Sequence, residues 1–169
     1  TQMCIDGAGN IYIVQFSHHR VRKISPDGTI TRFAGTGTAG YNGDGIPATD
    51  AQLKFPRGVA ADAAGNIYIS DASNFIVRKV NTSGIISTVA GDVTGSVAHG
   101  DGGPATDASF GEPHDICVDG TGNIYFYCPN LSQIKKVATD GTITRFAGKA
   151  ALTYGFCGDG GQASNACLD

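Results

Sequence analysis

Two cysteines and three aspartate-bearing loops are the parts of this 169-residue chain whose residue types and spacing suggest chemistry. Cys157 and Cys167 lie on either side of a Gly-Asp-Gly segment, and the two other loops of this kind have no such pair of cysteines. A disulfide that closes the loop explains why both cysteines occur together, and it implies an oxidising compartment. No Cys-x-x-Cys spacing occurs, so a structural zinc site is not expected.

Each Gly-Asp-Gly loop carries a second Asp or Asn six residues after its aspartate. Carboxylates on glycine-rich loops can bind calcium, although calcium takes about six to eight oxygens and each loop offers at most two obvious carboxylates. The alternative is a structural role, in which the aspartate accepts hydrogen bonds from backbone N–H groups. The calcium candidates are Asp44, Asp50, Asp101, Asp107 and Asp159.

The elements that position these loops are three copies of one repeat. The tetrapeptide Gly-Asn-Ile-Tyr at 9–12 returns at 65–68 and 122–125, at spacings of 56 and 57 residues. A basic pair, an Ala-Gly pair and the Gly-Asp-Gly loop keep step with it. A repeat of this length is typical of solenoids and propellers. The copies cover about residues 1–56, 57–113 and 114–169.

Each repeat has the pattern of four short strands. In the second copy we predict strands over 58–62, 66–71, 76–81 and 86–91, separated by glycine-containing turns. The run 66–70 is nearly all apolar, which indicates that both faces of its sheet are covered. Four-stranded antiparallel sheets covered by neighbouring copies are the blades of a β-propeller. We therefore predict an all-β chain of three blades, with Cys4 and Cys117 as small buried residues of the innermost strands.

The segment 56–80 contains the pattern Pro-x-Gly-Val-x-x-Asp-x-x-Gly-Asn-Ile-Tyr-Ile-x-Asp-x-x-Asn, which resembles the NHL repeat. The loop at 100–108 looks like the long-loop subtype that is common in bacterial secreted and cell-surface proteins. This resemblance covers the whole chain and implies a propeller with six blades as the usual number, so three blades are half of a ring. The equivalents of Asp71 and Asn74 differ in the other two copies, so the resemblance does not identify a ligand.

The loops that enter the first strand and those between the second and third strands share one rim of a propeller. We expect a ligand-binding site on this rim, made of His18, His19, Arg20, Arg57, Asp71 and His114. His114 stands at a channel-lining position whose equivalents are Thr1 and Arg57, so one chain does not supply a ring of three histidines. A related six-bladed enzyme, the peptidyl-hydroxyglycine lyase, holds zinc with histidines around its central channel. This resemblance leaves a metal-dependent lyase or hydrolase as an alternative.

Charge and hydropathy argue against two classes of partner. The chain has 12 Lys and Arg against 15 Asp and Glu, and its formal net charge of −3 is opposite in sign to that of a nucleic-acid-binding surface. No apolar run approaches the roughly 18 residues that span a bilayer, so membrane insertion is not expected. Asn-x-Ser sequons at Asn81 and Asn130 lie in loops, where glycans attach if the source glycosylates.

The chain begins just after the position of a blade-opening proline, so we expect three whole repeats and two open apolar blade faces. Further blades must cover these faces, and they belong either to a second copy in a three-plus-three ring or to a longer chain. The principal hypothesis is a non-enzymatic, extracellular or cell-surface propeller without a cofactor, which binds protein, peptide or glycan. A channel enzyme that uses zinc or calcium and a structural assembly unit are the alternatives.

Overall fold

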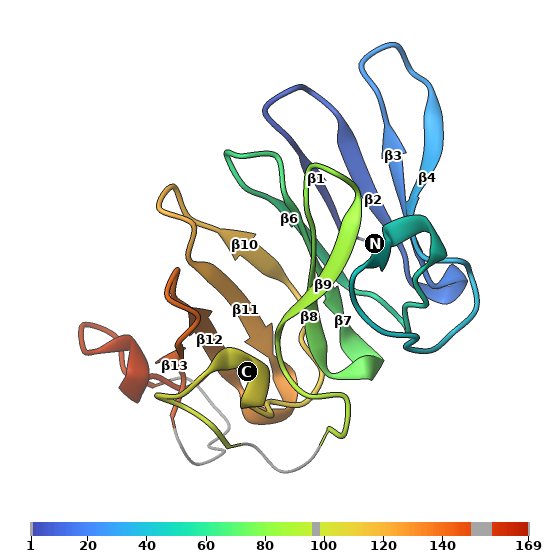
Figure 1. Ribbon diagram of the computed structural model, residues 1–169. Coiled ribbons are helices and arrows are strands. Elements are labelled where there is room, and N and C mark those ends of the chain that lie inside the picture. Colours follow the sequence, from blue (N-terminus) through green and yellow to red (C-terminus); the bar gives the residue numbers. More distant parts are fainter. Residues whose placement is uncertain (1, 96–98, 150–156, 169) are drawn as a thin grey trace.

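Three antiparallel β-sheets lie side by side as blades in the computed structural model, which describes residues 2–95, 99–149 and 157–168 (Figure 1). The strands of each blade are hydrogen-bonded in chain order. Within the described ranges, no helix combines the length and apolar character that a membrane crossing requires. Blade one contains β1 (Met3–Ile5), β2 (Ile11–Gln15), β3 (Arg20–Ile24) and β4 (Ile30–Ala34); blade two contains β6 (Gly58–Ala61), β7 (Ile67–Asp71), β8 (Ile76–Val80) and β9 (Ile85–Ala90); blade three contains β10 (Ile116–Val118), β11 (Ile124–Cys128), β12 (Gln133–Val137) and β13 (Ile143–Ala147).

The predicted strands of the second repeat are confirmed to within one residue at each end. One aspartate fixes the turn between the first two strands of every blade. Asp62 accepts hydrogen bonds from the Asn66 backbone N–H (2.8 Å), the Asn66 side-chain amide (2.7 Å) and the Tyr68 hydroxyl (3.1 Å). Gly65 has φ +86° in this turn, where a side chain would be strained. The same carboxylate contacts are made by Asp6 and Asp119.

The turn between the second and third strands of each blade is a short 3-10 turn at the opposite end of the sheet. In blade two it spans η3 (Ala72–Asn74) and ends on Phe75, which has φ +62° and donates its backbone N–H to Ala72 O (2.9 Å). Blades one and three repeat this geometry at η1 (Phe16–His18) and η5 (Pro129–Leu131). These three corners therefore lie on one rim, as the sequence predicts.

Two apolar cores lie between the blades. Val14 and Val21 of blade one pack with Ile67 of blade two in the first core, and Tyr68 of blade two packs with Phe126 of blade three in the second. All five residues of β7 are buried, which confirms that blade two is covered on both faces.

Blades one and three each have one open face. Cys117 is exposed, whereas Ala60 at the same position of blade two is 6% exposed. The prediction of burial is therefore wrong for Cys117, because no described blade covers its side of β10. Cys4 lies on the covered side of β1, where burial, with a smaller effect from Asp6, raises the pKa of its thiol to about 11.

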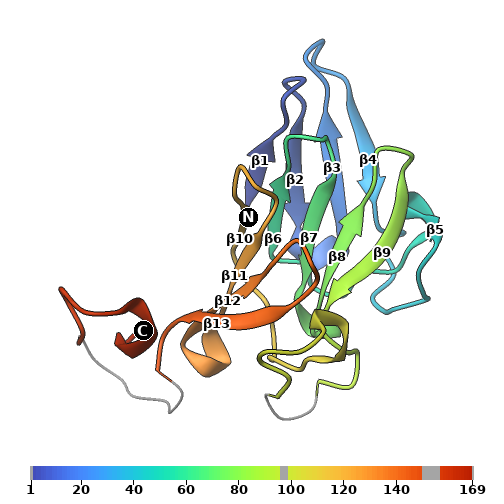
Figure 2. The same ribbon diagram turned by 60° about the vertical axis from the view of Figure 1, so that its left-hand side comes forward.

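The Gly-Asp-Gly loop of each of the first two repeats lies on the next blade. A short strand from the first repeat, β5 (Ile46–Pro47), pairs with β9, so that the middle sheet has five strands (Figure 2). Pro104 of the second repeat forms the corresponding bridge with Thr142 of blade three. A 3-10 turn follows in each loop: η2 (Ala48–Asp50), η4 (Ala105–Asp107) and, in the third repeat, η6 (Ala163–Asn165). Each of the first two sequence repeats therefore contributes strands or bridges to two blades.

Candidate functional site

A hollow of about 430 Å³ lies on the rim where the innermost strands begin. Arg57 enters it from the start of β6, held by a hydrogen bond from its backbone N–H to Ser70 O (3.0 Å). His114 enters it from blade three, where its N–H donates to Tyr127 O (2.8 Å). The equivalent position in blade one, Thr1, lies outside the described residues. The hollow is lined by Gln2, Val14, Phe16, Pro56, Arg57, His114 and Asp115.

Arg57 is the positive group of this hollow. Its guanidinium carbon lies 4.8 Å from the centroid of the Phe16 ring, which is a cation–π contact between blades one and two. Its Nε atom is buried and has no hydrogen-bond partner among the described residues. The guanidinium is therefore positioned by stacking, and it keeps donor capacity for a ligand.

His114 supplies a neutral imidazole beside this cation. Burial, followed by the positive charge of Arg57, lowers the pKa of His114 and so favours the neutral ring, although Glu112 and Asp115 act in the opposite direction. Its Nε2 atom is 3.9 Å from the Glu112 carboxylate, which accepts a hydrogen bond from the Ser73 hydroxyl (2.9 Å). The neutral ring can donate one hydrogen bond and accept another.

Gln2 and Asp115 form the polar wall of the hollow. The side chain of Gln2 donates to Asp115 Oδ1 (3.1 Å) and accepts from the backbone N–H of Val59 (2.8 Å), so it connects all three blades. Across the described ranges, no group of three or more His, Cys, Asp or Glu side chains is placed to hold a metal ion. A guanidinium, a neutral imidazole and an amide in one hollow can instead bind a carboxylate or a hydroxyl-rich ligand.

Four of the six predicted rim residues lie outside this hollow: His18, His19, Arg20 and Asp71. His19 accepts a hydrogen bond from the Phe55 backbone N–H (3.2 Å), and the two rings lie 4.6 Å apart in an edge contact. His18 is exposed at the end of η1, and its carbonyl accepts from Arg20 Nε (3.2 Å). Of the six predicted residues, the structure therefore brings Arg57 and His114 together in the hollow.

Asp71, the sixth predicted rim residue, is fully buried within blade two and does not reach the rim surface. It accepts hydrogen bonds from the Lys54 backbone N–H (2.7 Å) and from the Asn74 amide (2.8 Å), and Arg78 Nη1 is 3.8 Å away. Burial raises the pKa of Asp71 to about 7, although these donors and the Arg78 charge act in the opposite direction. Its contacts assign it a structural role.

Two of the five aspartates proposed for calcium, Asp44 and Asp101, contact basic residues of the following blade. Asp44 Oδ1 is 2.8 Å from Arg78 Nη2, and Asp101 is 2.9 Å from Lys135 Nζ. The third aspartate, Asp159, is exposed. Asp50 and Asp107 are exposed beside the threonines that precede them. Calcium binding stays a prediction that metal analysis must test.

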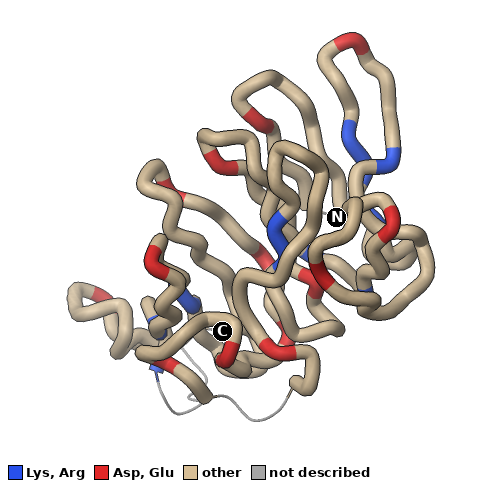
Figure 3. The backbone as a smooth tube through the Cα atoms, viewed as in Figure 1, with Lys and Arg blue, Asp and Glu red and all other residues tan. Residues whose placement is uncertain are grey.

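The sequence reasoning missed these two ion pairs between blades. Each joins an aspartate to a basic residue 34 positions later, so the constant offset was a usable signal. Figure 3 shows the Lys and Arg positions spread over the three blades. Arg78 and Lys135 lie at the contacts between neighbouring blades, and the basic residues are not gathered on one face.

Cys157 and Cys167 form the predicted disulfide across the third Gly-Asp-Gly loop. The backbone N–H of Cys167 also donates to Cys157 O (3.1 Å). In the second loop His99 and Ser109 form the same antiparallel bridge. His99 is therefore the structural counterpart of Cys157, and Ser109 is the counterpart of Cys167. The disulfide therefore adds a covalent link to a backbone bridge that both loops share.

The stacked sheets, with an aspartate-fixed turn and a loop passed to the next blade, define a β-propeller of the NHL-repeat type. The family model described as the Teneurin NHL domain matches residues 37–99, which include blade two. Teneurin-4 of Mus musculus is 29% identical over 160 residues, an alignment that covers 86% of this chain and 5% of that protein.

Two solved structures show the same fold. An auxiliary nutrient binding protein from Bacteroides thetaiotaomicron has a TM-score of 0.67 at 20% identity, covering 85% of this chain and 36% of that one. A protein of unknown function from the same organism has a TM-score of 0.61 at 36% identity, covering 70% of this chain and 29% of that one. The chain therefore spans 5% of Teneurin-4 and about a third of each of these two solved chains.

Proposed function

We propose that this chain contributes blades to a non-enzymatic, extracellular or cell-surface propeller, which binds a carboxylate-bearing protein, peptide or glycan at the rim hollow. The observation that carries the proposal is the Arg57 guanidinium, stacked on Phe16 beside the neutral His114. A stacked and partly desolvated guanidinium is a strong and directional receptor for a carboxylate. The disulfide and the similarity to the Teneurin NHL domain support an extracellular location.

Further blades complete the propeller, because the outer faces of blades one and three are apolar and open. In this proposal they come from a second copy or from the rest of a longer chain. The hollow is bordered by all three described blades, so the remaining blades would form the opposite wall of the same channel mouth.

Binding of acidic and neutral oligosaccharides and of short glutamate-rich peptides tests the proposal. Arg57→Ala is expected to abolish binding of the acidic probes, and Arg57→Lys to retain part of it. Arg32→Ala removes an exposed arginine from β4 and serves as the matched control. Acidic probes that bind Arg57→Ala as well as the parent chain would contradict the proposal.

Elemental analysis tests the metal-dependent alternative. A catalytic zinc site takes about three protein ligands, and His114 is the one histidine that lines the hollow among the described residues. Stoichiometric zinc, with an activity lost on chelation, would favour the lyase or hydrolase. Protein without bound metal that binds the acidic probes would favour the binding module.

A further inference from the structure

Every seam between two described blades contains the same backbone contacts. In the first seam, Gly45 N–H donates to Ile86 O (2.9 Å) and Ala48 N–H donates to Gly84 O (2.8 Å). In the second seam, Gly102 and Ala105 donate in the same way to Ile143 O (2.7 Å) and Gly141 O (2.8 Å). The loop of one blade therefore extends the sheet of the next blade along its outermost strand.

Each seam also contains one ion pair. The Asp44–Arg78 pair crosses the first seam, and the side chain of Arg78 is fully buried. The Asp101–Lys135 pair crosses the second seam, and the Lys135 side chain is 6% exposed. The basic member comes from the third strand of the blade that receives the loop. A seam is therefore the contact between two neighbouring blades that consists of these backbone hydrogen bonds, one ion pair and an apolar core.

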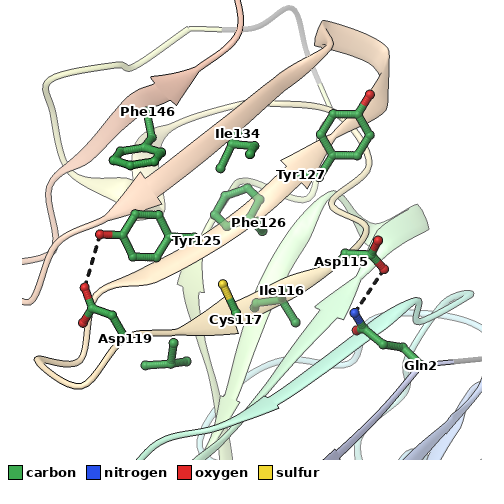
Figure 4. Close-up of a pocket in the computed structure, with 11 residues that line it drawn as sticks. Gln2, Asp115, Ile116, Cys117, Asp119, Tyr125, Phe126, Tyr127, Ile134 and Phe146 are labelled. Carbon is green, nitrogen blue, oxygen red and sulfur yellow. Dashed lines mark hydrogen bonds between the residues drawn. The ribbon is translucent and has the colours of Figure 1, made fainter. Parts of the chain in front are cut away.

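Blade three and its loop present the donating half of a third seam. Asp159, Gly160 and Ala163 stand at the positions of Asp44, Gly45 and Ala48, and Asp159 is exposed. The open face of blade three contains a hollow of about 660 Å³ (Figure 4). It is lined by apolar side chains that include Tyr125 and Phe146, the latter 49% exposed.

The third loop already has the conformation of the loops that are docked. Gly158 has φ +96° against +94° for Gly100, and Gly160 has +76°, the same value as Gly45. The disulfide between Cys157 and Cys167 closes this loop. A loop that is preorganised without a neighbour loses less entropy when a neighbour binds.

Blade one presents the receiving half. Its outermost strand, β4, has a free edge in the described sheet, with Gly28 and Ile30 at the positions of Gly84 and Ile86. Arg22 stands at the position of Arg78, half-buried, and its Nε donates to Thr31 O (3.1 Å).

The open face of blade one is apolar in the same way. Met3 and Ile5 are 69% and 64% exposed. They occupy the positions of Val59 and Ala61, which pack against blade one in the first core. The face of blade one therefore matches the face with which blade two covers its neighbour.

We infer that a second copy of this chain covers blade three, with its own blade one in the place of a fourth blade. Asp159 then pairs with Arg22 of the second copy, and the third loop extends the β4 edge of that copy. Two such seams, related by a two-fold axis, close a six-bladed ring. The chain carries both halves of the seam with complementary charge, which favours a second copy over an unrelated partner. This inference does not depend on the proposed rim ligand.

Sedimentation over a concentration series, with charge-reversed variants, tests the inference. The chain is expected to sediment at twice its mass of 17.3 kDa. Asp159→Arg and Arg22→Asp are each expected to raise the dissociation constant by at least about thirtyfold, because each places like charges in both seams. The double variant is expected to recover the parent constant. Asp140→Arg, which makes the same charge change in an exposed turn, is the control.

Circular dichroism of each variant establishes that its blades are folded. A folded chain that stays monomeric at every concentration would overturn the inference, and blades from a longer chain would then cover these faces. A dimer that is insensitive to both single reversals would also overturn it, because the contact would lie elsewhere. Loss of rim binding in Arg57→Ala has no bearing on this result.

Discussion

Removal of the Asp44 carboxylate tests the role assigned to the seam ion pair. Arg78 is fully buried, and its Nη2 donates to Asp44 Oδ1 and Gly43 O, both at 2.8 Å. In Asp44→Ala the guanidinium keeps the Gly43 carbonyl, the Tyr41 ring at 5.0 Å and the Asp71 carboxylate at 3.8 Å. Two of its nitrogens, Nε and Nη1, have no hydrogen-bond partner in the described structure. The remaining contacts therefore compensate the charge incompletely.

The expected cost follows from burial. Loss of one partner of a fully buried ion pair costs about 3–5 kcal/mol. The Asp44 side chain is 39% exposed, so water can reach the vacated position, and we expect a loss of about 2 kcal/mol in unfolding free energy. Asp101→Ala is the matched variant of the second seam. It should cost about 1 kcal/mol or less, because the flexible Lys135 chain can move its ammonium group into water.

Urea unfolding of the four members of a double-mutant cycle, with Arg78→Met as the second substitution, measures the coupling. We expect Asp44→Ala to cost much less in the Arg78→Met background, since no buried charge remains to be compensated. Equal costs in both backgrounds would refute the reasoning. So would an Asp101→Ala variant less stable than Asp44→Ala, because burial would then not determine the magnitude.

Three further predictions concern turns, titration and the disulfide. Asp62→Ala should destabilise the chain by about 2 kcal/mol in urea unfolding, because three donors lose their acceptor, whereas Asp27→Ala in an exposed turn should have a much smaller effect. The raised pKa of Asp71 means that its contribution to stability is full below about pH 4 and is lost as pH rises through about 7. Asp71→Asn should therefore flatten the decline in unfolding free energy over this interval, and an unchanged pH profile would contradict the burial argument. Reduction of the disulfide should increase amide exchange at Gly161 and Ala166, which donate hydrogen bonds within the third loop, and should leave exchange in β7 unchanged.

The sequence was sufficient to predict the blades because each blade contains its own local signals. Asp62, Gly65 and Tyr68 form one hydrogen-bonded turn, and its recurrence at a fixed spacing indicates both the turn and the repeat. Strand limits followed from the apolar runs between such turns. The disulfide was predictable because Cys157 and Cys167 replace residues at both ends of one loop.

The candidate site was predictable only in part, because burial depends on neighbouring chain segments. Asp71 and Arg57 belong to the same predicted rim, yet Asp71 points into blade two and Arg57 lines the hollow. Cys117 and Ala60 share one repeat position and differ in exposure, because blade three covers Ala60. Phe16 was not predicted to hold Arg57, since a single sequence does not show which aromatic ring lies beside a given cation.

The loop that each repeat passes forward has a consequence for how such chains change length over evolution. A repeat encodes the donating half of one seam and the receiving half of another, as Asp101 and Arg78 of the second repeat do. Duplication of one repeat in the gene would insert a blade whose two interfaces already fit its neighbours. Blade number can therefore change by whole units without new interfaces, and only the curvature of the ring must adapt.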